Sequence, residues 1–110
     1  MNYHVSWTKD AEKNLEEILD YIIDNDGVNI AKKIYLKIKD KTGLLKVSPF
    51  LGREVKELKS LKMNYHELIV KPWRIIYTID NDIVNVLLII DSRRDLEELL
   101  YGMIINIDHT

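Results

Sequence analysis

Two strongly apolar runs joined by a short polar turn dominate the second half of the sequence. The runs cover residues 74–79 and 83–90, and the letters DND between them are typical of a β-hairpin turn. Within the second run, the segment VNVLLII at residues 84–90 hardly alternates between polar and apolar positions. That pattern is typical of a strand buried on both faces. We therefore expect a hairpin whose second strand is central in its sheet, with other structure packed on each side.

Helical periodicity marks two segments in the first half of the chain, after a short alternating strand at residues 3–7. Thr8 is suited to cap the first helix, which we expect to end at the sequence DNDG, and Asn29 is suited to cap the second. The first helix is acidic and the second basic, with seven acids in residues 10–26 and six lysines in residues 32–46. Surface ion pairs contribute little, so we expect apolar stripes to hold these helices together as an antiparallel hairpin.

The segments that flank the two strands are less regular. Residues 48–53, SPFLGR, form a turn by their proline and glycine content, and residues 54–67 fit either a strand with a loop or a helical turn. Ser92 and Asp95 have the spacing of a capping box, so we expect a helix from there to the C-terminus. The element order is then strand, helix, helix, three or four strands and helix. This order predicts one α+β domain over residues 1–110, with the helical hairpin packed on a mostly antiparallel four-stranded sheet.

Composition excludes several classes of protein. A chain of 110 residues with 46% hydrophobic and 31% charged residues has the length of one globular domain and is too apolar to be disordered. It has no cysteine, and its three histidines, at positions 4, 66 and 109, do not have the spacing of metal ligands. No run of 18 apolar residues and no signal-peptide pattern is present. We therefore expect a cytoplasmic protein with no metal site, no cofactor and no membrane segment.

Four stretches of this sequence resemble the RelE/ParE superfamily of toxins from type II toxin–antitoxin modules. AEKNLEEILDYI is similar to the family's first helix, SPFLGREV to its loop after the helical hairpin, YHELIVKPWRIIY to its central strand pair, and LLIIDSRRDLEELL to its last strand and closing segment. The resemblance implies a small toxin that a cognate antitoxin neutralises. The RelE-like branch cleaves messenger RNA on the ribosome, whereas the ParE-like branch inhibits DNA gyrase, and a shared fold does not distinguish them.

The RelE-like alternative implies a site for RNA cleavage, which needs a base, an acid and cations near the phosphate. By resemblance, Arg74 and Arg94 match the two arginines of that site. The other positions match poorly, because His66 stands where lysines are expected and Tyr101 lies one residue beyond the position of the family's tyrosine. Asp91 replaces a histidine that many relatives have, and a carboxylate there repels phosphate. Arg74 and Arg94, with His66 and Tyr101 as weaker members, are therefore the candidate catalytic residues.

Three arginines lie at the ends of neighbouring predicted elements: Arg74 begins one strand, and Arg93 and Arg94 follow the next. The fold can therefore gather them into one concave basic spot, although the protein has a net charge of −2. Such a spot, with Trp73 beside it for stacking, would bind an anionic partner: RNA, a gyrase surface or acidic residues of an antitoxin. The equally weighted structural alternative is that the arginines pair with nearby acids, which are Glu67, Asp91, Asp95 and Glu97.

The predicted C-terminal helix carries an apolar stripe longer than it needs to close the sheet, namely Leu99, Leu100, Met103, Ile104 and Ile107. We expect part of it to bind the antitoxin or a second copy, in a homodimer or a toxin–antitoxin hetero-oligomer. The incomplete acid–base chemistry and an isoelectric point of about 5.9 favour the ParE-like gyrase inhibitor, because a nuclease that docks in the ribosome should be basic. The alternatives are the RelE-like endoribonuclease and an inactive relative that retains only antitoxin binding.

Overall fold

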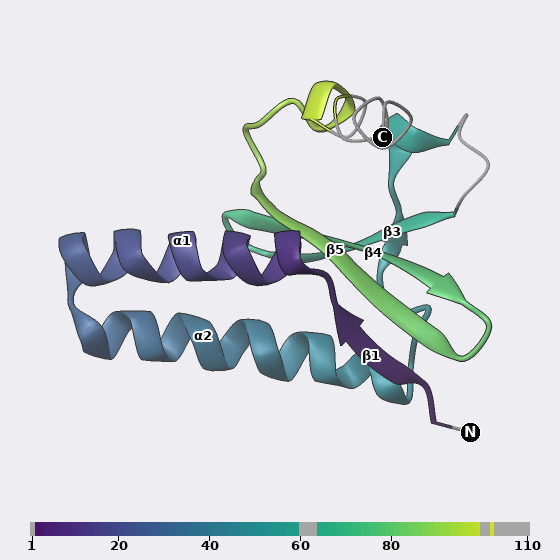
Figure 1. The fold of residues 1–110 in the computed structure, drawn as a ribbon, viewed down its shortest axis with the longest axis horizontal. Helices are drawn as coiled ribbons and strands as arrows, with labels where there is room; N and C mark the ends of the chain where they lie inside the picture. The colour runs from purple at the N-terminus through teal and green to yellow at the C-terminus, as the bar shows by residue number, and fades with distance from the viewer. Residues whose placement is uncertain (1, 60–63, 100–101, 103–110) are drawn as a thin grey trace.

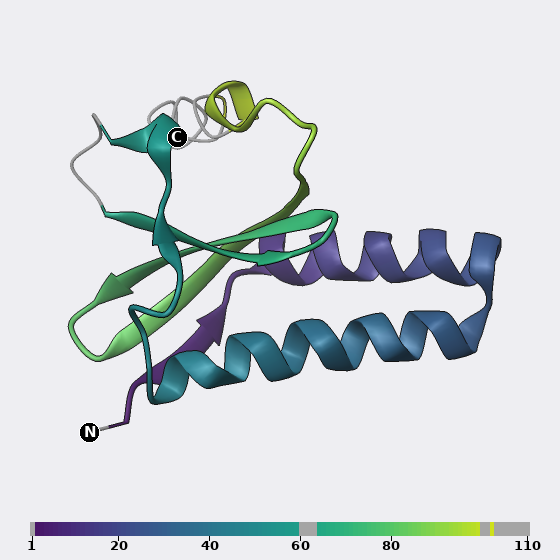
Figure 2. The same cartoon turned by 180° about the vertical axis from the view of Figure 1, so that it is seen from behind.

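The computed structural model describes residues 2–59, 64–99 and 102, and it confirms an α+β fold (Figure 1). Within these residues the sheet has five strands in the order β1-β5-β4-β3-β2, with the two long helices packed against one face. The far ends of both helices project beyond the sheet, as the view from behind also shows (Figure 2). In chain order the elements are β1 (His4–Trp7), α1 (Lys9–Asp26), α2 (Val28–Gly43), the 3₁₀ turn η1 (Leu44–Lys46), β2 (Arg53–Glu54), the 3₁₀ turn η2 (Lys56–Leu58), β3 (Tyr65–Val70), β4 (Trp73–Asp80) and β5 (Ile83–Asp91).

The sheet is mostly antiparallel, as the sequence predicts. β1 is the exception, because it runs parallel to β5. Four strands were expected, and the described residues contain one more, the edge strand β2. β2 has two residues, of which Arg53 pairs with Glu67 and Glu54 with His66 of β3. A strand this short has no hydrophobic period, so its sequence does not reveal it.

A single glycine joins the two helices of the hairpin. Thr8 caps α1 as predicted, since its side-chain oxygen accepts a hydrogen bond from the amide of Ala11 at 3.1 Å. Gly27 has a φ of 95°, a conformation that favours glycine, and its amide donates to two carbonyl oxygens in the last turns of α1. The prediction that Asn29 caps α2 is wrong. α2 begins at Val28, directly after the glycine, so Asn29 already lies inside the helix.

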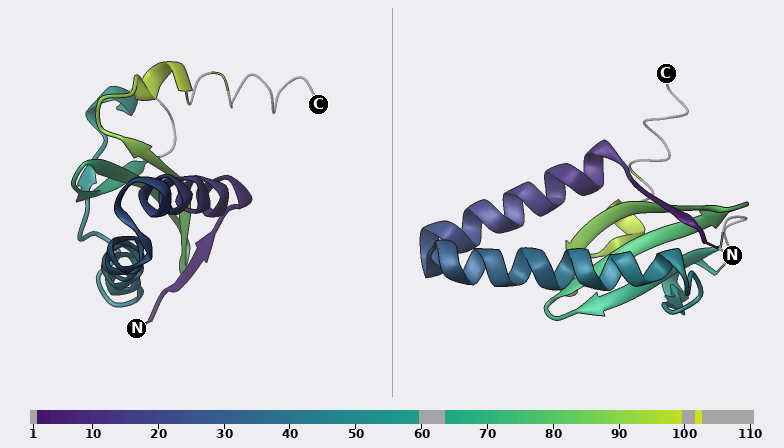
Figure 3. Two further views of the ribbon diagram at one scale, coloured as in Figure 1. Left: turned by 90° about the vertical axis from the view of Figure 1, so that its left-hand side faces the viewer. Right: turned by 90° about the horizontal axis from the view of Figure 1, so that it is seen from below.

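Apolar side chains fill both faces of the sheet. The first cluster lies between the sheet and the helical hairpin. The second lies on the opposite face and includes residues of η2 and of the helical residues 96–99. Figure 3 shows the hairpin and this last helical segment on opposite sides of the sheet. β5 contributes to both clusters and lies between β1 and β4, which confirms that it is a central strand covered on both faces. The buried members of the second cluster are Val55, Leu58, Ile76, Leu88, Ile90 and Leu96.

A β-bulge at Leu87 explains why the sequence of β5 hardly alternates. Val86 and Leu88 pair with adjacent residues of β4, so Leu87 between them is an additional residue. The bulge shifts the alternation by one position, so that Val86 and Ile89 both belong to the first cluster while Leu88 belongs to the second. The carbonyl oxygen of Leu87 accepts a hydrogen bond from the hydroxyl of Thr8 at 3.0 Å. Thr8, the N-cap of α1, therefore supplies a hydrogen-bond donor to a backbone carbonyl at the bulge.

The last helical segment begins later than the sequence predicts. Asp95, not Ser92, caps it, because the carboxylate of Asp95 accepts a hydrogen bond from the amide of Glu98 at 3.2 Å and residues 96–99 are helical. Ser92 lies in the turn after β5, where its amide donates to the carbonyl oxygen of Pro72 at 2.8 Å. The remaining positions of the predicted apolar stripe and the candidate tyrosine lie outside the described residues; they are Leu100, Tyr101, Met103, Ile104 and Ile107.

Candidate functional site

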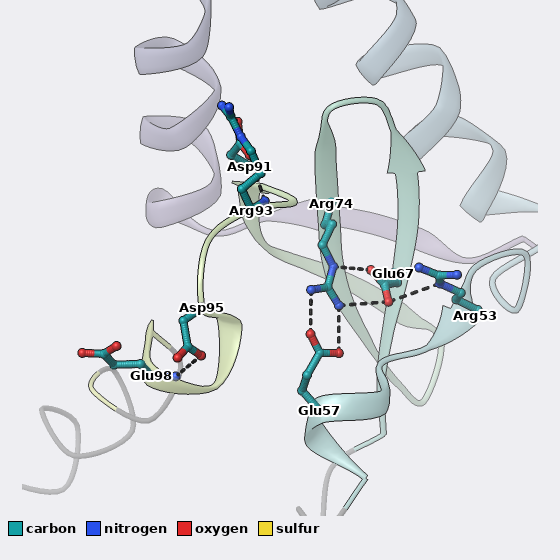
Figure 4. Close-up of polar contacts among 8 residues, drawn as sticks. All are labelled: Arg53, Glu57, Glu67, Arg74, Asp91, Arg93, Asp95 and Glu98. Atoms are coloured by element: carbon teal, nitrogen blue, oxygen red, sulfur yellow. Dashed lines mark hydrogen bonds and ion pairs between the residues drawn. The ribbon is translucent and has the colours of Figure 1, made fainter.

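Arg74 is at the centre of a network of four alternating charges (Figure 4). Its side chain is only 10% exposed and lies between Glu67 of β3 and Glu57 of η2. Nε and Nη2 donate to the two oxygens of Glu67 at 2.6 and 3.1 Å, and Nη1 and Nη2 donate to the two oxygens of Glu57 at 2.7 and 3.1 Å. Arg53 of β2 completes the network, with its Nε 3.3 Å from an oxygen of Glu67.

The hydrogen bonds in this network shift the pKa values of two of its members. Those to Glu57 and Glu67 raise the pKa of Arg74 above its usual range, and the hydrogen bond from Arg74 lowers the pKa of Glu57. The guanidinium is therefore charged and already directs four hydrogen bonds to carboxylates. A phosphate or a partner's carboxylate would have to displace one of these acids to reach it. The ion pair with Glu67, the structural alternative for this residue, is present in the structure.

A cavity of about 590 Å³ opens beside the network. Four cations and two acids line it, so an anion that enters would meet a net positive charge. Two of the cations, Lys56 and Lys71, are exposed, whereas Arg74 is buried. The lining residues are Arg53, Lys56, Glu57, Glu67, Ile69, Lys71, Pro72, Arg74 and Ser92.

Arg93 and Arg94 lie in the turn beyond the end of β5. Asp91 accepts hydrogen bonds from Nε, Nη2 and the amide of Arg93, each at 2.9 Å. These hydrogen bonds lower the pKa of Asp91 to about 2, although the Arg93 side chain is 87% exposed. Arg94 is also exposed, and its side chain makes no hydrogen bond or ion pair with any residue that the structure describes. Of the two arginines, Arg94 therefore presents its donors to solvent.

Trp73 and Arg74 are neighbours on β4 but face opposite sides of the sheet. Trp73 packs against the first cluster and lines a cleft of about 670 Å³ between α1 and the end of β5, together with Arg93 and Arg94. Arg74 lines the other cavity, so the basic spot expected from the sequence is divided between two places. Tyr21 of α1 lines the same cleft as Trp73 and is 70% exposed. Sequence reasoning did not identify Tyr21; its position outside the apolar stripe of the helix is the signal that could have done so.

His66 is enclosed by aromatic rings on the side of the sheet that faces the helices. Its ring stacks on Tyr77 with 5.5 Å between centroids and meets Phe50 edge-on at 5.9 Å. Burial lowers the pKa of His66, and its Nδ1 is buried without a hydrogen-bond partner among the described residues. The next residue of β3 bonds to Arg74, and successive residues of a strand face opposite sides, so His66 points away from Arg74. The structure does not bring these two candidates into one site.

Among the described residues, no group of three or more histidine, aspartate or glutamate side chains is placed to hold a metal ion. None of the helices in those residues combines the length and the apolar character that a membrane crossing requires.

Comparisons with known proteins agree with the fold. Residues 5–96 match the family described as "ParE toxin of type II toxin-antitoxin system, parDE". "Toxin ParE3" of Caulobacter vibrioides is 27% identical to this chain over 89 residues, which cover 81% of this chain and 86% of that toxin. A solved chain described as "Chromosomal ParDE TA system from P. aeruginosa" shares the fold with a TM-score of 0.68 at 18% identity, over 81% of this chain and 95% of that one. Because the family match extends from β1 to the start of the last helical segment, this chain belongs to the ParE toxins of type II toxin–antitoxin systems.

Proposed function

We propose that this ParE-family toxin arrests growth by inhibiting DNA gyrase and that a cognate antitoxin neutralises it. The family match over residues 5–96 carries the proposal, because gyrase inhibition is the activity that the ParE-like branch of the superfamily implies. The family description also names a two-component toxin–antitoxin system, which supports an antitoxin partner. An isoelectric point of about 5.9 fits a protein target better than the polyanionic ribosome. A cytoplasmic location follows from these partners and is part of the proposal.

The proposed target-binding residues are Trp73, Arg93 and Arg94, which line one cleft. Arginine and tryptophan are enriched among the residues that dominate protein–protein binding, and an arginine can grip a carboxylate with two parallel hydrogen bonds. Asp91 already holds Arg93, so we assign the larger contribution to Arg94. Arg74 was also predicted to contact the target, but its engagement by two carboxylates supports a structural role for it.

The geometry gives less support to the alternative, a RelE-like endoribonuclease. Cleavage needs an acid, a base and cations arranged around one phosphate. Arg74 and His66 face opposite sides of the sheet, and Arg94 lies at a different cavity from Arg74. The three candidates that the structure describes therefore do not converge on one site. The third reading, an inactive relative, differs from the proposal only in having no effect on gyrase.

The apolar residues predicted to bind the antitoxin remain part of the proposal. Leu99 is half-buried against the second cluster, so it helps to close the core as well as offering some surface. The other predicted contacts, Leu100, Met103 and Ile104, lie outside the described residues.

A supercoiling assay with purified toxin and DNA gyrase tests the proposal. We expect inhibition at micromolar toxin and its relief by the antitoxin. Ribosome-bound messages incubated with the same toxin should remain intact. Cleavage of the messages without inhibition of gyrase would favour the nuclease, and neither effect would favour the inactive relative.

A further inference from the structure

Four large apolar side chains are exposed in the short segment between α2 and β2. Leu44, Val47, Phe50 and Leu51 are 54%, 73%, 68% and 49% exposed. Single exposed apolar residues need no explanation, whereas a contiguous group usually marks an interaction surface. We refer to these four residues as the 44–51 patch.

Hydrogen bonds close two consecutive turns in the segment that carries the patch. The carbonyl oxygen of Leu44 accepts from the amides of Val47 and Ser48 at 3.2 and 2.9 Å, and the carbonyl oxygen of Ser48 accepts from the amide of Leu51 at 3.1 Å. Leu44 and Val47 are three positions apart across the turn of η1, so their side chains lie on the same side of that turn. Phe50 and Leu51 follow in the next turn, which the Ser48–Leu51 hydrogen bond closes.

Buried groups beneath the patch hold it in place. The hydroxyl of Tyr77, whose side chain is fully buried, donates to the carbonyl oxygen of Pro49 at 2.8 Å and accepts from the amide of Gly52 at 2.9 Å. Leu45 is also fully buried, in the first cluster. The fold therefore holds the apolar side chains toward solvent on a fixed backbone. A preorganised surface of this kind loses less conformational entropy when a partner binds.

The surroundings of the patch are basic. Residues 37–54 contain five basic and two acidic residues, although the whole protein has a net charge of −2. Lys41, Lys46 and Arg53 are all exposed. Arg53 pairs with Glu67, but its side chain is still 66% exposed. An acidic partner would therefore be attracted to the same place that offers apolar contact.

We propose that the 44–51 patch binds an acidic, amphipathic segment of the cognate antitoxin. The apolar side of that segment covers the patch, and its carboxylates meet Lys41, Lys46 and Arg53. The inference rests on the antitoxin partner of the proposed function and assigns to it a surface separate from the C-terminal stripe. A nucleic acid fits less well, because its phosphates would face four large apolar side chains. A second copy of the chain also fits less well. Its acidic surface is on α1, and the only large apolar residues that this helix exposes in the described structure are Tyr21 and Ile23.

Val47→Asp tests the inference, with Val28→Asp as a matched control. Val28 is 65% exposed and lies at the other end of α2, about 24 Å from Leu44 at 1.5 Å per residue. The probe is the full-length product of any small open reading frame found adjacent to the toxin gene, titrated by calorimetry. We expect Val47→Asp to weaken binding at least tenfold and Val28→Asp less than twofold, with little change in either thermal midpoint. Lys41→Gln combined with Lys46→Gln should reduce the salt dependence of Kd.

Unchanged binding by Val47→Asp, or an equal loss in Val28→Asp, would overturn the inference. The inference would also be overturned if Val47→Asp changed self-association, or binding to a duplex DNA probe, and left antitoxin binding unchanged. If the wild-type toxin does not bind the product of the adjacent frame, the antitoxin partner of the proposed function fails first, and this inference fails with it.

Discussion

Glu67 and Arg74 form a bidentate ion pair inside the protein, with Oε1–Nε and Oε2–Nη2 distances of 2.6 and 3.1 Å and side chains that are 2% and 10% exposed. Glu57 binds the same guanidinium from η2, so the pair also ties that turn to the sheet. Desolvation offsets much of the attraction in a buried pair, but removing one partner leaves a charge without compensation. This asymmetry allows the structural role of Arg74 to be measured.

We expect Glu67→Ala to lower the free energy of unfolding by roughly 3 kcal/mol, because it leaves the buried guanidinium of Arg74 with Glu57 alone. Arg53→Ala removes a mostly exposed partner of Glu67 and should cost less than about 1 kcal/mol. Urea denaturation measures both. Equal costs would contradict the network described above. If Arg74→Met instead abolished growth arrest with no loss of stability, Arg74 would be a target contact.

Replacement by alanine should change the stability of the protein in opposite directions at two of its glycines. A Cβ atom at Gly52 would lie 2.7 Å from the hydroxyl of Tyr77 and 2.9 Å from the carbonyl carbon of Glu67, so Gly52→Ala should destabilise the protein by about 1–3 kcal/mol. A Cβ atom at Gly43, in α2, would meet nothing within 4 Å, so Gly43→Ala should stabilise by up to about 1 kcal/mol through helix propensity. Thermal unfolding of the two variants provides the measurement, and shifts of the same sign would contradict this account.

Acid should destabilise the protein through His66. Burial lowers its pKa from the ordinary value of 6.5, so the unfolded chain takes up a proton at a higher pH than the folded chain does. The contribution of this group to stability is complete above pH 6.5 and declines as the pH falls from there through the folded-state pKa. Denaturant titrations from neutral to mildly acidic pH should show the decline in the wild type and a smaller one in His66→Phe. An equal decline in the wild type and in His66→Phe would contradict this assignment.

Replacing Arg93 and Arg94 together by alanine should weaken gyrase inhibition more than about tenfold, equivalent to about 1.4 kcal/mol, because their forks can anchor carboxylates of the target. Arg94→Ala alone should account for most of the loss, since Asp91 already occupies the fork of Arg93. Both side chains are exposed, so the thermal midpoint should move little. Supercoiling assays and growth curves report the effect.

A lysine pair at the same two positions should restore inhibition only in part, because an ammonium group lacks the planar fork. Inhibition by the double alanine variant at wild-type potency would remove these arginines from the interface with the target.

The features that depend on neighbours in sequence were determined by the sequence itself. The side chain of Thr8 reaches an amide three residues away, and Gly27 ends α1 because its positive φ favours glycine. The β4–β5 hairpin follows from a polar turn between two apolar strands, and the wholly apolar end of β5 correctly indicated a central strand. The family resemblance also depends on short sequence motifs, and the family match over residues 5–96 confirms it.

Only the tertiary structure decided how the arginines are used. Glu57 and Arg74 lie 17 residues apart and meet because η2 packs over the sheet, a contact that no local pattern encodes. Trp73 and Arg74 are adjacent in sequence, yet the alternation of a strand sends them to different cavities. The cap of the last helix moved from Ser92 to Asp95 because the turn after β5 bonds back to the β3–β4 hairpin. In each case the outcome depends on pairing and packing between distant segments, whose energies a linear pattern of residue types does not contain.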